Sequence, residues 1–236
     1  MCASVSVYCF IVWMQEKMSI SFILACAFSL LGTMFHSGVI GLAVGYAVIL
    51  FLYDRHQNTY RLSFRNIFMT ALVVLLFVFI YTNYSELFFS YFMRADSIED
   101  IASGVGEGGS TYAQYVGNSS SILNMAIYTV PRLVYFLFSP FPWQWRGLSD
   151  IIAVVFNSLF YIITYINMFK YLKRKTPENR AIVIALMIVA LCVAFIYGWG
   201  VSNTGTAVRH RDKMIALYTI LWCCTSNGKR RTGRYI

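Results

Sequence analysis

Long apolar runs separated by short polar stretches dominate this chain of 236 residues. At ~1.5 Å of rise per helical residue, the longest runs are close to the length that crosses a hydrocarbon layer of ~30 Å. Apolar and polar residues do not alternate within them, so the pattern favours helices over strands. The five long runs cover residues 18–35, 38–53, 66–81, 151–169 and 181–199.

Two shorter apolar stretches, 4–14 and 214–224, are marginal in length for a membrane crossing. We therefore predict an all-α fold, a polytopic integral membrane protein with about five to seven transmembrane helices. The composition agrees, because 58% of the residues are hydrophobic and only 12% are charged. The six cysteines lie in or beside apolar runs and lack the spacing of metal ligands, so we predict neither a metal site nor a cofactor.

The basic residues predict the orientation. The formal net charge is +9, but basic residues cluster in 54–65, in 170–180 and in the tail, as in short cytoplasmic loops, so we predict no nucleic-acid partner. The opening stretch then begins on the outer face. The predicted organisation is N-terminal transmembrane helices over 1–83, a large external loop over 84–146, and C-terminal helices over 147–236 with an external loop at 200–213 and a basic tail.

The large external loop changes character along its length. Its first part is acidic and then rich in glycine and serine, which indicates a water-facing, flexible loop able to close over a substrate. Its second part is apolar, and we predict an interfacial or re-entrant segment there. Pro131, Pro140 and Pro142 should break a regular helix, and Trp143 and Trp145 suit the headgroup level.

Several basic residues fall on the predicted outer face, although Lys and Arg are usually enriched in cytoplasmic loops. The paired N–H donors of an arginine guanidinium match phosphate oxygens, so the predicted ligand is an anionic lipid headgroup. The alternative is pairing with acidic residues of the loop or with lipid phosphates. Arg132 stands out because it interrupts an apolar segment. The external basic residues are Arg94, Arg132, Arg146, Arg209, Arg211 and Lys213, of which Lys213 is expected to matter less.

The stretch "RHRDK" places His210 between Arg209 and Arg211. A histidine that titrates near neutrality is a candidate general base, and the alternative is a histidine that only donates a hydrogen bond. His36 could join the site or cap a turn. Tyr112 and Tyr115 in the external loop could stack on sugar rings or lie at the membrane interface as ordinary tyrosines.

A multi-span chain with an external loop that contains arginines, the stretch "SPFPW" and a later external "RHRDK" resembles the bacterial O-antigen and exopolysaccharide polymerases, relatives of the O-antigen ligases. The resemblance is strongest over 85–220 and rests on arrangement more than on a strict signature. By position, the resemblance points to Arg94, Arg132, Arg209 and Arg211. Taken with the reasoning from the residues, the predicted substrate-binding arginines are Arg94, Arg132 and Arg146, and the predicted catalytic residues are Arg209, His210 and Arg211. The family usually has more spans, so we expect this chain to correspond to a C-terminal portion.

The resemblance also implies a function. The expected activity is transfer or polymerisation of polyprenyl-pyrophosphate-linked oligosaccharide units at the bacterial cytoplasmic membrane, by a metal-independent glycosyltransferase. Its partners would be the lipid-linked glycan, the lipid bilayer and other polysaccharide assembly proteins. The alternative is a polysaccharide exporter or flippase-like transporter without catalysis, which would place charges along a path within the spans.

Overall fold

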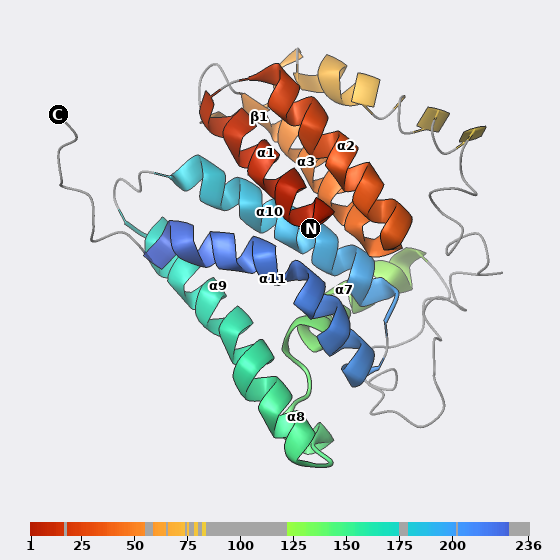
Figure 1. Cartoon of the computed structure of the whole chain (residues 1–236), viewed down its shortest axis with the longest axis vertical. Helices are drawn as coiled ribbons and strands as arrows, with labels where there is room; N and C mark the ends of the chain where they lie inside the picture. The colour runs from red at the N-terminus through yellow and green to blue at the C-terminus, as the bar shows by residue number, and fades with distance from the viewer. Residues whose placement is uncertain are drawn as a thin grey trace.

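The computed structural model describes residues 1–16, 18–54, 59–64, 66–73, 75, 78–79, 82–83, 122–174, 179–201 and 203–226. Most of these residues are helical, so the all-α prediction is confirmed (Figure 1). The elements in chain order are α1 (Cys2–Glu16), α2 (Ser19–Phe35), η1 (Ser37–Val39), α3 (Ile40–Leu52), β1 (Tyr53–Asp54), β2 (Thr59–Tyr60), α7 (Ile122–Phe138), η2 (Pro142–Gln144), α8 (Leu148–Ala153), η3 (Val154–Ser158), α9 (Leu159–Leu172), α10 (Arg180–Trp199) and α11 (Thr204–Ser226).

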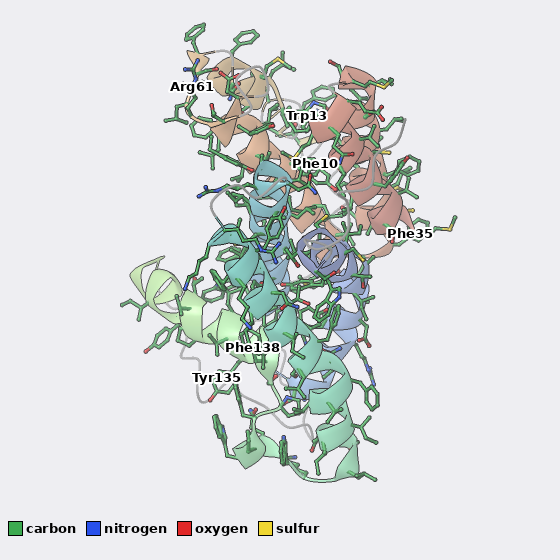
Figure 2. The ribbon with its side chains drawn as sticks, turned by 90° about the vertical axis from the view of Figure 1, so that its left-hand side faces the viewer. Phe10, Trp13, Phe35, Arg61, Tyr135 and Phe138 are labelled. Atoms are coloured by element: carbon green, nitrogen blue, oxygen red, sulfur yellow. The ribbon has the colours of Figure 1, made fainter. Side chains whose placement is uncertain are left out.

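The helices α1, α2 and α3 pack together at one side of the molecule (Figure 1). The buried Ser6 hydroxyl donates to the Ala25 carbonyl oxygen at 2.7 Å and lies 2.9 Å from the Tyr46 hydroxyl, which ties the three helices together. Phe10 stacks on Tyr46 with ring centroids 4.4 Å apart. Figure 2 shows Phe10 among the helices, whereas Phe35 points away from them.

The helix α10 is central, and α3 packs against it in the opposite direction. Backbone approaches backbone here, because the position of a Cβ on Gly41 lies 2.6 Å from the Val193 Cα and one on Gly45 lies 2.8 Å from the Val189 Cα. Small residues at a four-residue spacing permit such close packing. The other face of α10 contacts α7 and α11, so residues from both ends of the chain surround it (Figure 1).

Two ends of the helical bundle can be distinguished. At the first, called the hairpin end (53–54, 59–60, 171–174 and 179–181), the Tyr60 hydroxyl donates to the Ala181 carbonyl at 2.5 Å and the Asn179 N–H donates to the Tyr171 hydroxyl at 2.9 Å. At the opposite, histidine end (35–39 and 197–210), His36 lies beside Tyr197 and His210. Basic residues at or beside the hairpin end are Arg61, Lys170, Lys173, Arg174 and Arg180.

Two of the described helices are long and apolar enough to cross a membrane, judged by length and composition. They are Leu148–Leu172, made of α8, η3 and α9, and Arg180–Trp199. Apolar helices of 10–17 residues also occur at Ser19–Phe35, Ile40–Leu52 and Ile127–Phe138. The predicted helices over 18–35, 151–169 and 181–199 therefore agree closely with the structure, and the marginal stretch 4–14 is part of a helix too.

Two local predictions were wrong. Pro131 does not break the helix but lies inside α7, which continues to Phe138, and the break comes only before Pro140 and Pro142. A proline removes one backbone donor, and the packing of α7 on α10 holds the helix despite that loss. The predicted loop over 200–213 is helical from Thr204, because the Asn203 side-chain oxygen accepts from the Gly205 N–H at 2.8 Å and caps the helix.

Candidate functional site

The stretch "RHRDK" lies in the first turns of α11, and this decides which of its side chains can meet. Successive residues of an α-helix point about 100° apart. Arg209, His210 and Arg211 therefore face three different directions and do not converge on one ligand. Arg209 is exposed, His210 is half-buried and Arg211 is fully buried.

Arg211 binds the backbone of the segment that follows α7. Its Nη1 donates to the Leu137 carbonyl at 2.6 Å, and its Nη2 donates to the Ser139 carbonyl at 2.5 Å. Nη1 also lies 3.2 Å from the Ser158 hydroxyl oxygen, and the Tyr161 hydroxyl donates to the Arg211 carbonyl at 2.5 Å. The guanidinium group that was predicted to bind phosphate thus binds backbone carbonyls inside the protein, and we assign Arg211 a structural role.

A π-helical segment, η3, contributes to the same group of buried polar contacts around Arg211. It interrupts the long helix Leu148–Leu172 and carries two buried polar residues, Asn157 and Ser158. The Asn157 side-chain amide donates to Asp212 at 2.8 Å, and the Ser158 hydroxyl donates to the Ser139 carbonyl at 3.1 Å. Buried polar groups are costly without partners, so the first bond fixes the long helix against α11 and the second fixes it against the segment that follows α7.

A different group of side chains meets at the histidine end. His36, Tyr197, His210 and Lys213 form what we call the histidine cluster. The ring centroids of His36 and His210 are 5.0 Å apart, and those of Tyr197 and His210 are 4.8 Å apart. The Lys213 ammonium donates to His36 Nε2. Residues three and four apart share a helix face, so Lys213 lies beside both His210 and Arg209.

The histidine cluster contains two buried polar atoms that have no hydrogen-bond partner among the described residues. The Tyr197 hydroxyl is buried and has no hydrogen-bond partner among the described residues, and the same holds for His210 Nδ1. Burial lowers the pKa of His210, so its imidazole is neutral at neutral pH and able to accept a proton. Partial burial also lowers the pKa of Lys213.

The described acidic residues lie elsewhere. Asp54 pairs with Arg61, Asp212 accepts from Asn157, and Asp150 accepts from the backbone of Arg146. Glu16 ends α1, close to the start of α2 and far along the bundle from His36. Within the part of the chain that the structure describes, the cationic groups of the histidine cluster therefore face no carboxylate.

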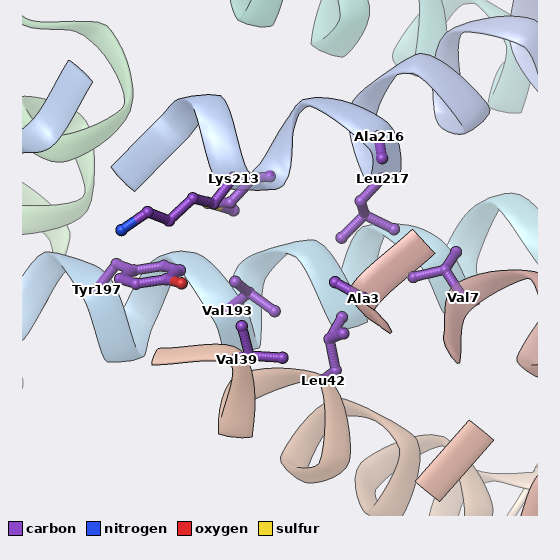
Figure 3. A pocket seen from close by; sticks show the side chains of 10 residues that line it. Ala3, Val7, Val39, Leu42, Val193, Tyr197, Lys213, Ala216 and Leu217 are labelled. Carbon is purple, nitrogen blue, oxygen red and sulfur yellow. The ribbon is translucent and has the colours of Figure 1, made fainter. Parts of the chain in front are cut away.

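A small crevice adjoins the histidine cluster, and Figure 3 shows the Lys213 side chain lying over the Tyr197 ring at one end of it. Apolar residues of the lining include Val39, Val193 and Leu217. The cavity volume of about 20 Å³ has room for one water molecule, so a larger guest would not fit inside it.

Of the remaining predicted site residues, the structure describes Arg132 and Arg146. Arg132 is buried, with its guanidinium 4.5 Å from the centre of the Trp199 ring, a cation–π contact. Arg146 is exposed before α8, and its N–H donates to Asp150 at 2.7 Å. Arg94, Tyr112 and Tyr115 lie outside the described residues. Among the residues described, no three histidine, cysteine or acidic side chains are grouped to hold a metal ion.

Sequence reasoning expected Lys213 to matter less than the two arginines, and it did not consider Tyr197. The signal for Lys213 was present, since Asn203 can cap a helix and a helical reading places Lys213 on the face of Arg209 and His210. Tyr197 could not be found in this way, because it comes from α10 and meets α11 only through packing. No protein family, curated protein or solved structure matches this chain.

Proposed function

We propose that this chain is a multi-pass protein of the bacterial cytoplasmic membrane that transfers or polymerises polyprenyl-pyrophosphate-linked oligosaccharide units. The membrane part of the proposal is supported by the two apolar helices of sufficient length and by apolar side chains on the outer surface. Phe156 on the long helix is 77% exposed and Phe35 at the end of α2 is 85% exposed. Such side chains are stable against lipid and costly against water.

The observation that carries the proposal is the separation of two basic regions at opposite ends of the bundle. The basic residues of the hairpin end are those expected on the cytoplasmic side. The histidine cluster, with Arg209 beside it, then lies at the outer end, where a lipid-linked sugar pyrophosphate would present its charge. Lys213 and the other groups of the histidine cluster face no described carboxylate, so they are suited to bind such an anion.

The proposed chemistry needs charge stabilisation and a base. Cleavage of a glycosyl pyrophosphate leaves negative charge on the departing phosphate, which Lys213 and Arg209 would stabilise. The acceptor sugar hydroxyl must lose a proton, and the neutral His210 ring would take it. Arg211 contributes by holding α11 against α7 and η3, so that the face carrying His210 and Lys213 stays turned toward His36.

The test is the polymer length on a gel from cells that depend on this chain for their surface polysaccharide. Lys213→Met and His210→Ala should shorten or abolish the polymer at matched protein levels. Lys173→Met is the matched control, because it removes the same charge from the opposite end and should leave the polymer unchanged. Wild-type polymer from both Lys213→Met and His210→Ala would refute the proposal. Accumulation of lipid-linked units inside the cell would indicate a transporter instead.

A further inference from the structure

We propose that the histidine cluster is a proton-coupled oxyanion site, in which a phosphate-class anion binds Lys213 and His36 takes up one proton from solvent. The inference rests on the proposed function for the identity of the natural ligand. The groups that would contact the anion are Lys213, His36 and Tyr197. Arg211, which was predicted from the sequence, would not contact it.

The starting point is the contact between Lys213 and His36. The ammonium donates to His36 Nε2, which requires a lone pair on that nitrogen and hence a neutral imidazole. The backbone N–H of His36 donates to the Gly32 carbonyl at 2.9 Å, which fixes the residue at the end of α2. In the unliganded site, His36 therefore serves as a neutral acceptor for the lysine.

An anion changes this arrangement. Phosphate oxygens are stronger acceptors for an ammonium group than an imidazole nitrogen is, so the anion replaces His36 as the partner of Lys213. His36 Nε2 is then released beside a negative charge, which favours the protonated ring. Protonated His36 becomes a second cation for the same anion, and the net reaction is binding of one anion with uptake of one proton from solvent.

Tyr197 supplies an independent observation at the same place. Its side chain is only 4% exposed and lines the crevice, and its hydroxyl has no hydrogen-bond partner among the described residues. Buried hydroxyls nearly always have a partner, so this group would be completed by a water molecule in the crevice or, in the proposal, by an anion oxygen that displaces that water. Its ring centroid is 5.5 Å from that of His36, so an anion held by the histidine would be near the hydroxyl.

Few titratable groups lie near His36 among the described residues. Around the crevice, α1 contributes Ala3 and Val7, and the segment from η1 to α3 contributes Val39 and Leu42, all of them apolar. The titratable groups that face His36 are Tyr197 on α10 and His210 and Lys213 on α11. None of these described groups carries a negative charge at neutral pH, so in the proposal the charge that favours protonation of His36 comes from the ligand.

The experiment is isothermal titration calorimetry of the full chain in nanodiscs, with inorganic pyrophosphate and with farnesyl pyrophosphate as separate probes. Titration at about pH 7.5, where an ordinary histidine is mostly neutral, in buffers of different ionisation enthalpy gives the number of protons taken up. We expect about one more proton per bound anion in the wild type than in His36→Gln, whose amide still accepts from Lys213. Tighter binding of farnesyl pyrophosphate would indicate a lipid ligand, and equal binding a soluble phosphate.

Lys213→Met should weaken binding of both probes by about tenfold or more, the typical value of a charge-assisted hydrogen bond. Lys173→Met should not weaken it, and Lys213→Arg, which keeps the charge, should retain binding and report on folding. Equal proton uptake in the wild type and His36→Gln, or unchanged affinity in Lys213→Met, would overturn the proposal. Coupled binding by a chain that makes no polymer would refute only the proposed function.

Discussion

The contact between α3 and α10 allows a prediction of size as well as direction. Replacing Gly41 by alanine places a Cβ 2.6 Å from the Val193 Cα, about 0.8 Å closer than the shortest ordinary van der Waals contact of 3.4 Å. The obstructing atom is backbone, so a rotamer change cannot relieve the clash and the two helices must separate. Overpacking of this kind costs about 1–3 kcal/mol, and the rigid obstacle favours the upper part of that range.

Alanine also brings a gain. It has a better helix propensity than glycine by about 1 kcal/mol, which offsets part of the clash. We therefore expect Gly41→Ala to lower the free energy of unfolding by about 2 kcal/mol, or roughly 4–8 °C in melting temperature for a chain of this size. The measurement is thermal unfolding in detergent, followed by circular dichroism at the helical minimum.

Gly147→Ala is the control, because a Cβ there meets no atom within 4 Å. It should leave the melting temperature within about 1–2 °C of the wild type. Shortening the neighbour in Gly41→Ala/Val193→Ala should not restore stability, since the clash is with the backbone of Val193 and not with its side chain. Equal melting temperatures for Gly41→Ala and Gly147→Ala would refute the close approach of the two helices.

Three further predictions follow from the polar residues. Arg211→Met should lower the melting temperature more than Arg209→Met, because it removes the side-chain donor of the Leu137 carbonyl and one of two donors to the Ser139 carbonyl, at about 1–3 kcal/mol for a buried group left unsatisfied. Arg209→Met removes only an exposed charge, and parallel thermal melts compare the two variants. The lowered pKa of His210 means that folding favours the neutral imidazole. The contribution of this group to the free energy of unfolding is therefore complete above about pH 6.5 and is lost as the pH falls below that value. His210→Gln should therefore lose less stability than the wild type between pH 7.5 and pH 5, and parallel slopes in a series of melts would contradict this. In a cysteine-free background in intact cells, Arg209→Cys should react with an impermeant thiol reagent and Lys173→Cys should not; the reverse result would invert the proposed orientation.

The helices themselves were determined by the sequence. Runs such as 181–199 and 151–169 are too long and apolar to leave backbone groups unpaired, so they form helices in any packing. Successive helices that run in opposite directions also bring alternate connections to the same end. This is why the basic stretches around Arg61 and Lys173, assigned to one side from charge alone, belong to the same end of the bundle.

Only the tertiary structure decided which side chains form the site. A sequence does not specify the rotation of a helix about its axis, which is set by the neighbours that it packs against. Packing of α11 on η3 and the end of α7 turns Arg211 inward and leaves Lys213 beside His36, a residue 177 positions earlier in the chain. Pro131 likewise remains helical because of packing on α10 that no local pattern predicts. The apolar runs thus determined where helices form, and long-range packing determined which groups Arg211 and Lys213 contact.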